Sequence, residues 1–415
     1  MKSKILLINN CHFRRGGADV VYLNTGSLLQ KNGHGVIYFS MKDEKNQANE
    51  YENYFVNKIN FFEKNLFKKF FSLFRFFFSF EAMDRLDKLI KLENPDIAHI
   101  HFYKGGLTSS IIKVLIKNKI PIIFTAHDYG IIDPHNNLLD GNYNINHAVV
   151  NRGPFYSVIS KSNRNSYLLS FISYLEYSFH NFFFPFDKVF NTIIAVSKFS
   201  EKIFKDSKFF NFNIKHLYNF FPKIETALPN HNKGDYFLFF GRLTDEKGFK
   251  TLINVWNQSD LDAKLVIAGN YDVQNYDVKF NKIIEDNNSI STVGFKKGVE
   301  LENLIKNANF ILMPSEWYEN NPLSIIESYA LGKPVIGTDI GGISEIIEHD
   351  KTGFLFQMKD ERELAKYINK ALEMSDEDYL KMSINARNFA LKNFNPKNHY
   401  ESLIKIYNKT IQDYE

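Results

Sequence analysis

Cysteine is nearly absent from this chain of 415 residues, since Cys11 is the only one. A single thiol excludes an internal disulfide and is typical of a protein of the reducing cytoplasm. We interpret Cys11 as a loop residue rather than a nucleophile. Long apolar runs are also missing, because no stretch of about 18 uncharged apolar residues occurs. We therefore expect a cytoplasmic protein with no membrane-spanning helix and no secretory signal.

A strong charge of one sign is missing as well. Lys and Arg total 51 against 47 Asp and Glu, which gives a formal net charge of +4, and the basic residues are spread along the chain. This balance does not favour nucleic acid as a partner. The hydrophobic fraction of 44% is ordinary for a globular protein, and the length predicts two domains. Phenylalanine is the residue in excess, with 41 copies.

Both halves of the chain alternate short apolar segments with amphipathic helical ones, which is typical of parallel sheets covered on both faces. The strands expected in the first half are residues 5–8, 36–39, 96–100, 122–125 and 193–196. Those expected in the second half are residues 236–240, 265–268, 292–294, 310–313 and 335–338. The predicted fold class is α/β, with two doubly wound domains.

The domain boundaries follow from this alternation and from one polar stretch. Residues 1–221 form the first predicted domain and residues 236–395 the second, and the polar, proline-containing segment 222–235 is the linker between them. Residues 396–415 read as a C-terminal helix that we expect to return to the first domain. Two such domains create a cleft at the carboxyl edges of their sheets, where ligands bind preferentially.

Two carboxylates, Glu319 and Glu327, stand eight positions apart after the expected strand 310–313. Pro322 suits the first turn of a helix, so Glu319 should lie in the loop after a parallel strand and Glu327 about one turn into the next helix. Open α/β sheets bind ligands at this edge, where the amides of a helix N-terminus meet phosphate. This segment is the most informative about function.

A second loop, residues 241–248, follows the first strand of the second half. Gly241 permits close backbone approach, Arg242 offers a planar fork for phosphate oxygens, and Lys247 adds a point charge. Alone, this loop reads equally well as a solvated loop before a helix. Beside Glu319 and Glu327, it favours a site for a phosphorylated ligand.

These residues resemble the signature of glycosyltransferase family 4. The second half matches through G-R-L-x-x-E-K-G at 241–248, V-G-F at 293–295, P-S then E-x7-E at 314–327, A-L-G-K-P-V at 330–335, G-G-x-x-E at 341–345 and T-G-F-L at 352–355. The first half matches more loosely, at residues 16–17, 96–101, 125–128 and 195–198. The region of about 135–190 has no counterpart that we can match, and we expect it to shape the acceptor site.

The resemblance implies a GT-B fold, in which two Rossmann-like domains face each other across a cleft. It implies retaining transfer of a sugar from a UDP- or GDP-sugar to a glycan or lipid-linked hydroxyl, in the synthesis of surface polysaccharide, lipopolysaccharide or glycolipid. No cofactor or metal is expected, because fixed cations fill the role of the metal. Two alternatives stay open, a non-catalytic GT-B partner that binds nucleotide or glycan, and a nucleotide-sugar epimerase.

The resemblance also implies a role for each site residue. Arg242 and Lys247 would neutralise the diphosphate, Glu319 would hold the donor sugar, and Glu327 would bind the ribose hydroxyls. His127 ends an expected strand and is either structural or a hydrogen-bond partner of the donor sugar, and we favour the second. The expected catalytic set is thus His127, Glu319, Arg242 and Lys247. The remaining expected donor-binding positions are Gly16, Gly17, Gly241, Gly294, Asn320, Asn321, Leu323 and Glu327.

Phenylalanine gathers in residues 61–80 and 179–190. In the first cluster, Lys64, Lys68 and Arg75 fall on one helical stripe and phenylalanines cover most of the rest. This pattern predicts either a helix that buries a wide apolar face or a basic amphipathic helix that rests on an anionic membrane surface. The second cluster would extend the same surface. We keep both interpretations.

Overall fold

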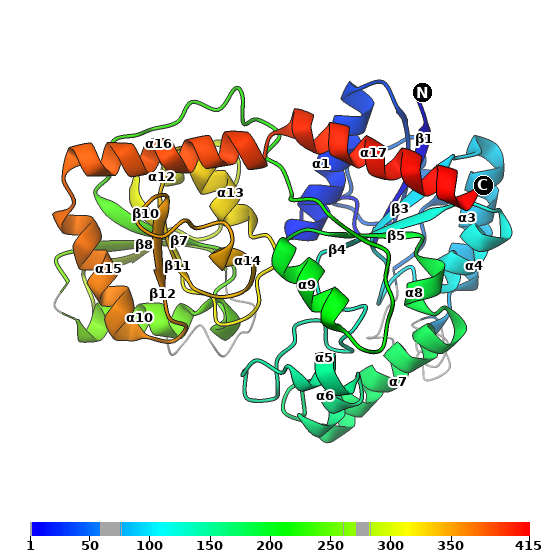
Figure 1. Ribbon diagram of the computed structural model, residues 1–415, viewed down its shortest axis with the longest axis horizontal. Helices are drawn as coiled ribbons and strands as arrows, with labels where there is room; N and C mark the ends of the chain where they lie inside the picture. The colour runs from blue at the N-terminus through cyan, green and yellow to red at the C-terminus, as the bar shows by residue number, and fades with distance from the viewer. Residues whose placement is uncertain (1, 59–74, 76, 260, 271–281, 283) are drawn as a thin grey trace. The chain divides into compact units, whose positions relative to one another are not determined.

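The computed structural model describes residues 2–58, 75, 77–259, 261–270, 282 and 284–415. The chain divides into two compact units (Figure 1). The first unit comprises Met1–Asn142, Asn146–Leu217 and His399–Glu415, and the second comprises Tyr143–Ile145 and Tyr218–Asn398. Each unit is built around one parallel sheet, and each is described by itself below.

The sheet of the first unit has six parallel strands in the order β2-β1-β3-β4-β5-β6. Their bounds are β1 Lys4–Asn9, β2 Gly35–Phe39, β3 Ile97–Phe102, β4 Ile122–Ala126, β5 Thr192–Ala195 and β6 Ile214–His216. The helices are α1 Gly17–Lys31, α3 Phe80–Glu93, α4 Ser110–Lys117, α5 Ala148–Arg152, α6 Tyr156–Ile159, α7 Tyr167–Phe183, α8 Phe186–Val189 and α9 Lys198–Asp206, with the 3-10 turn η1 Glu52–Tyr54.

The C-terminal helix α17, Pro396–Tyr414, packs against this first sheet. Leu403 and Tyr407 are buried in the core that α1 also covers, and Thr410 Oγ1 lies 2.7 Å from Thr192 Oγ1 on β5. The last residues of the chain therefore complete one face of the first unit, and Figure 1 shows α17 beside α1.

The sheet of the second unit also has six parallel strands, in the order β12-β11-β10-β7-β8-β9. Their bounds are β7 Tyr236–Phe240, β8 Lys264–Ala268, β9 Ile290–Thr292, β10 Ala308–Met313, β11 Val335–Thr338 and β12 Gly353–Phe356. The helices are α10 Phe249–Gln258, α12 Val299–Asn307, α13 Leu323–Ala330, α14 Gly341–Ser344, α15 Glu361–Glu373 and α16 Asp376–Asn393, with the 3-10 turn η2 Asp245–Lys247.

Alternation along the strands produces two cores in the second unit. Phe237 and Phe239 of β7 face the core that α10 and α15 cover, whereas Leu238 faces the core of α12, α13 and α16. Successive side chains of a strand point to opposite faces, so both faces of these buried strands are apolar. The two sheets confirm the prediction of a doubly wound α/β fold.

The structure corrects the predicted strands at three places. β6 was missed because it is three residues long and contains only one apolar residue, Ile214. β12 was missed because it starts with Gly353 and three of its four residues read only as part of a family motif. The strand predicted at 292–294 lies at Ile290–Thr292 instead, since Gly294 has a φ of +67° and cannot extend it.

The two phenylalanine clusters have different outcomes. Most of residues 61–80 lie outside the described part of the chain, although Phe80 at the start of α3 is 64% exposed. In the second cluster Phe184, Phe186 and Phe190 are buried, whereas Phe182 and Phe183 are exposed. Among the described residues, the helices are all too short or too polar to cross a membrane.

Candidate active site

The strand order of the second sheet reverses between β7 and β10, so the loops that follow these two strands flank a switch point, where α/β sheets bind ligands. The two loops touch through backbone, because a Cβ on Gly248 would lie 1.7 Å from the Pro314 carbonyl oxygen. Gly248 also has a φ of +71°, which only glycine adopts readily. By contrast, no atom lies within 4 Å of a Cβ built on Gly241, which leaves its side of the loop open to a ligand.

An ion pair joins these two loops. Lys247 donates to Glu319 Oε1, and the same oxygen accepts from Ser315 Oγ at 2.9 Å and from Trp317 Nε1 at 2.8 Å. Burial by itself would raise the pKa of Glu319, but the charge of Lys247 and these three donors bring it below its ordinary value. Glu319 therefore stays an oriented carboxylate although it is only 6% exposed.

Arg242 lies in the loop after β7, and Glu327 lies in α13, the helix that follows the loop after β10. The Arg242 side chain is 51% exposed and stands 3.5 Å from Glu246, so its guanidinium remains accessible. Pro322 precedes the first residue of α13, Leu323, and Glu327 lies one turn further along this helix. Glu327 is half-buried, so part of its side chain is accessible.

The G-G-x-x-E motif supports the Glu319 loop from behind. The Gly342 amide donates to the Glu319 carbonyl at 2.6 Å, and a Cβ on Gly342 would lie 1.7 Å from the Asn320 carbonyl oxygen. A Cβ on Gly341 would lie 2.8 Å from the Glu319 carbonyl oxygen. This close packing explains why two glycines are needed here, and it fixes the backbone that carries the carboxylate.

Three further expected donor-binding positions have different surroundings. Asn320 and Asn321 are both buried, and Asn321 Oδ1 accepts from the Asn219 amide at 2.8 Å. The oxygen of Asn321 is thus engaged with backbone of the same unit. Gly294 has open space around it, since a Cβ added to it would have no atom within 4 Å. A ligand can therefore approach the backbone of Gly294 closely.

Gly16 and Gly17 open helix α1 in the first unit. The Gly16 amide donates to Asp19 Oδ2 at 3.1 Å, and Asp19 Oδ1 accepts from Asn9 Nδ2 at 2.8 Å at the end of β1. Asp19 is 4% exposed, so this buried carboxylate fastens the glycine turn to the strand. Asp19 was not predicted as a site residue, because its spacing from Gly16 matches an ordinary capping pattern.

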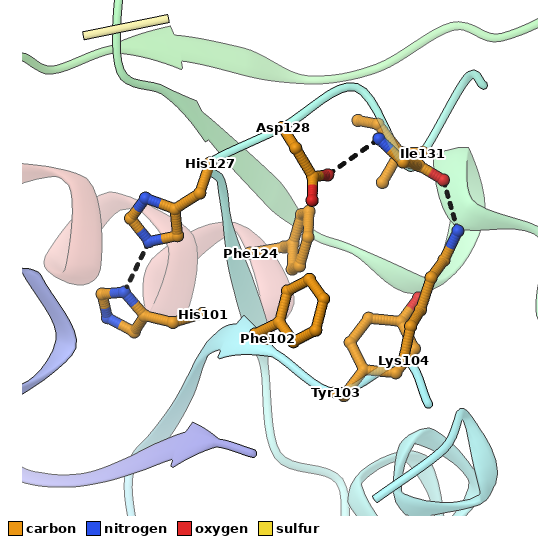
Figure 2. Close-up of a pocket in the computed structure, with 9 residues that line it drawn as sticks. His101, Phe102, Tyr103, Lys104, Phe124, His127, Asp128 and Ile131 are labelled. Atoms are coloured by element: carbon orange, nitrogen blue, oxygen red, sulfur yellow. Dashed lines mark hydrogen bonds between the residues drawn. The ribbon is translucent and has the colours of Figure 1, made fainter. Parts of the chain in front are cut away.

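His127 follows β4 and belongs to a cluster of neutral histidines. Its Nε2 lies 2.9 Å from His101 Nδ1 on β3, and the two rings stack with centroids 5.2 Å apart (Figure 2). His99, two residues before His101 on β3, contacts Thr125 Oγ1 at 2.6 Å and the Tyr407 hydroxyl at 2.7 Å. Burial lowers the pKa of His127 to about 4, so it acts as a neutral hydrogen-bonding group at physiological pH.

A small pocket lies beside this histidine pair. Lys104 lines this pocket and donates to the Gly130 carbonyl, while Asp128 accepts from the Gly130 amide at 2.8 Å (Figure 2). Burial lowers the pKa of Lys104 and raises that of Asp128. Sequence reasoning missed Lys104, since an isolated lysine after a strand carries no pattern. In the described part of the chain, we find no group of three His, Cys, Asp or Glu side chains placed to hold a metal ion.

Family models match nearly the whole chain. The Glycosyltransferase Family 4 model covers residues 15–221, and the Glycosyl transferases group 1 model covers residues 221–389. The chain belongs to glycosyltransferase family 4. The resemblance seen in the motifs is thereby confirmed for both halves of this family 4 protein.

Curated relatives of this family 4 protein match it to different extents. An uncharacterized glycosyltransferase of Methanocaldococcus jannaschii is 33% identical over 32% of this chain and 35% of its own length. A UDP-Gal:alpha-D-GlcNAc-diphosphoundecaprenol alpha-1,3-galactosyltransferase of Escherichia coli is 26% identical over 44% of this chain and 51% of its own length. The chain thus spans at most about half the length of these two relatives. An N-acetyl-alpha-D-glucosaminyl L-malate synthase of Bacillus anthracis is 22% identical over 100% of this chain and 98% of its own length.

Solved structures show the same fold. The Anabaena HepE protein in complex with UDP-glucose has a TM-score of 0.68 at 16% identity, over 98% of this chain and 100% of that one. Sucrose-phosphate synthase from Thermosynechococcus elongatus has a TM-score of 0.70 at 16% identity, over 99% and 100% of the two chains. The predicted GT-B fold class, with two Rossmann-like domains, is confirmed.

Proposed function

We propose that this protein is a retaining glycosyltransferase that transfers a sugar from a nucleoside-diphosphate donor to a glycan or lipid-linked hydroxyl in surface polysaccharide or glycolipid synthesis. The observation that carries the proposal is the Lys247–Glu319 pair at the switch point of the second sheet. Cations that flank a carboxylate fit a ligand with a negative diphosphate and a hydroxyl-rich sugar.

Each side chain of the second unit has one task in this proposal. Arg242 and Lys247 neutralise the diphosphate, which leaves with the electron pair of the broken bond to the sugar. Glu319 accepts hydrogen bonds from the sugar hydroxyls, and Glu327 accepts them from the ribose. The start of α13, at Leu323, adds backbone N–H groups. These fixed charges do the work of a metal ion, and transfer proceeds without a metal cofactor.

The first unit contributes a neutral imidazole and a glycine turn. His127, with its pKa near 4, hydrogen-bonds the donor sugar and does not act as a general base at neutral pH. Gly16 and Gly17 present backbone amides to the diphosphate. Two similar proteins support a nucleotide-sugar donor. HepE was solved with UDP-glucose, and the E. coli relative is named for UDP-Gal.

A panel of UDP- and GDP-sugars tests the proposal. Calorimetry measures binding, and release of the nucleoside diphosphate measures donor hydrolysis or transfer. We expect one donor to bind and to turn over. Binding without turnover would favour a non-catalytic GT-B partner, conversion of the sugar within the nucleotide sugar would favour an epimerase, and no binding to any donor would overturn the proposal.

We further propose that the first unit docks on an anionic membrane through α7. Eight apolar residues of this helix are exposed to at least 37%: Tyr167, Leu168, Leu169, Phe171, Ile172, Leu175, Phe182 and Phe183. Residues 148–175, which include most of α7, contain three cations, Arg152, Lys161 and Arg164, and no Asp or Glu. An apolar face flanked by cations fits an interface with anionic lipid, where a lipid-linked acceptor resides. The E. coli relative is named for an acceptor of that kind.

Vesicle flotation tests this docking. The double variant Leu168→Glu with Leu175→Glu places two charges on the exposed face of α7, and we expect it to remain with the aqueous fraction while the wild-type protein floats with phosphatidylglycerol vesicles. Leu380→Glu is the matched control, since Leu380 is also an exposed helical leucine (44%), in the second unit. If the wild-type protein does not float with anionic vesicles, the docking is refuted and the transferase proposal remains intact.

A further inference from the structure

Trp317 contacts both charged members of the pair that joins the two switch-point loops. Its indole Nε1 donates to Glu319 Oε1 at 2.8 Å, and the Lys247 ammonium lies 5.2 Å from the centroid of its ring. An ammonium within about 6 Å of an indole centroid is attracted to the face of the ring. One side chain thus holds the carboxylate through its edge and the cation through its face.

This double contact constrains the geometry of the pair. A lysine ammonium is a compact charge on a flexible stem, so a single contact to Glu319 would leave it several positions. The indole restricts the ammonium to the side of the carboxylate that the ring borders. Because Ser315 also donates to Glu319 Oε1, that oxygen has three donors. The pair is therefore assembled before any ligand arrives, and a site prepared in advance has less reorganisation to undergo when charge develops.

The second tryptophan of the chain has a different setting, which shows what an ordinary structural tryptophan does here. Trp256 on α10 is 4% exposed, packs in the core with Phe237, and donates its Nε1 to the Ala263 carbonyl at 3.0 Å. Trp317 is half-buried in a loop, and its Nε1 donates to a charged group instead. Packing alone accounts for Trp256 but does not account for the contacts of Trp317.

We infer that Trp317 is a positioning residue, which sets the arrangement of Lys247 and Glu319 for the diphosphate and the sugar of the donor. The inference rests on the proposed function. Trp317 itself need not touch the donor, since it acts through the two charged groups. Its loss should therefore lower the turnover number more than it raises the KM for the donor, because the misplaced charges matter most when the leaving group becomes negative.

The kinetic test compares conservative variants of the two tryptophans. Trp317→Phe keeps an aromatic face and removes the N–H donor, and we expect about a tenfold loss of kcat with less than a threefold change in KM. Trp317→Leu removes the aromatic face as well, and we expect it to lose more of kcat than Trp317→Phe. Trp256→Phe is the matched control and should retain wild-type constants. Wild-type constants in Trp317→Phe would overturn the inference, whereas a wild-type protein that turns over no nucleotide sugar would overturn the proposed function and this role together.

A spectroscopic test reads the same contact without turnover. The two indole N–H groups give two cross-peaks in a proton–nitrogen NMR spectrum, and Trp256→Phe identifies the peak of Trp317. We expect Glu319→Gln to move the Trp317 peak strongly and to leave the Trp256 peak in place. A Trp317 peak that does not respond to the loss of the carboxylate charge would contradict the contact on which the inference depends.

Discussion

Glu319 is the most constrained side chain of the candidate site, since one of its oxygens accepts from Lys247, Ser315 and Trp317. Its burial alone would favour the protonated acid, and the lysine reverses that preference. Lys247 therefore has two effects at once. It keeps Glu319 ionised, and it supplies one of the two cations proposed to meet the diphosphate.

Removal of Lys247 should consequently be severe. We expect Lys247→Ala to lower kcat/KM at least 100-fold, the cost typical of losing one preorganised donor to developing charge. The temperature of thermal unfolding should also fall, because Glu319 is left as a buried carboxylate without its cation. Steady-state kinetics with the donor found in the panel, together with calorimetric unfolding, measure both effects.

Lys250→Ala is the matched control for this variant, because Lys250 is exposed three residues further along, at the start of α10. It should change kcat/KM by less than about twofold, as expected for an exposed surface charge. Equal effects of the two substitutions would contradict a specific role for Lys247.

Glu327→Ala should raise the donor KM, and full retention of transfer by this variant would contradict the proposed ribose contact.

The sequence predicted the charged residues of the site but not their supports. Lys247 and Glu319 were expected near each other because both follow strands that end at one edge of a parallel sheet. Trp317, Asp19 and His101 were not assigned supporting roles, because such roles come from contacts between distant segments. The hydrogen bond between His127 and His101 joins residues 26 positions apart, so no local sequence pattern predicts it.

At the scale of elements, the turn that begins α14 holds the Glu319 loop in place. Gly342 donates to the Glu319 carbonyl and has no room for a Cβ against Asn320. The loop after β10 and the loop after β11 are thus in direct backbone contact. The position of the Glu319 loop thus depends on a glycine 23 residues away in sequence.

Gly342→Ala should therefore disturb the site as well as the fold. The added methyl forces the two loops apart, and we expect a loss of about 2 kcal/mol or more in unfolding free energy and at least a tenfold loss in kcat/KM. Denaturant titration and steady-state kinetics measure these changes.

Gly298→Ala provides the comparison for Gly342→Ala. Gly298 has a positive φ, of +57°, and no atom lies within 4 Å of a Cβ built there. Gly298→Ala should lose only the free energy of backbone strain, about 1–3 kcal/mol, and keep its kinetic constants. If Gly342→Ala retained wild-type kinetics, the loop contact would not be what positions Glu319.

The prediction of elements succeeded where burial on both faces produces apolar runs. Each of the ten predicted strands has an observed counterpart, and β7 and β11 have the predicted bounds. Short edge strands failed, since β6 and β12 contain only three and four residues. The exposed apolar face of α7 also has no signature in sequence, because an apolar helix reads alike whether its face is covered or open.

At the scale of the whole molecule, the two units differ in their buried histidines. Burial lowers the pKa of seven histidines of the first unit: His12, His34, His99, His101, His127, His135 and His216. In the second unit His231 shows the same shift. Buried neutral histidines resist protonation, whereas the same residues in an unfolded chain take up protons near pH 6.5.

The first unit should therefore lose stability in mild acid. A folded pKa below the unfolded value means that the unfolded state binds more protons as the pH falls below about 6.5, so stability decreases with falling pH. For His12 and His99, with folded pKa values of about 4 and about 3, each pH unit below 6.5 costs about 1.4 kcal/mol per histidine. Hydrogen exchange at pH 7.5 and 5.5 should show a larger loss of protection in the first unit than in the second. Equal losses in the two units would contradict this account.

The anomeric configuration of the product tests the central claim most directly. An α-linked nucleotide sugar identified in the panel is incubated with acceptor, and proton NMR follows the anomeric signal of the transferred sugar. The account predicts an α-linked product from the wild-type protein and at least a 100-fold slower appearance of that signal from Lys247→Ala. A β-linked product, or an unchanged rate in the Lys247 variant, would contradict a retaining transferase that works through this pair.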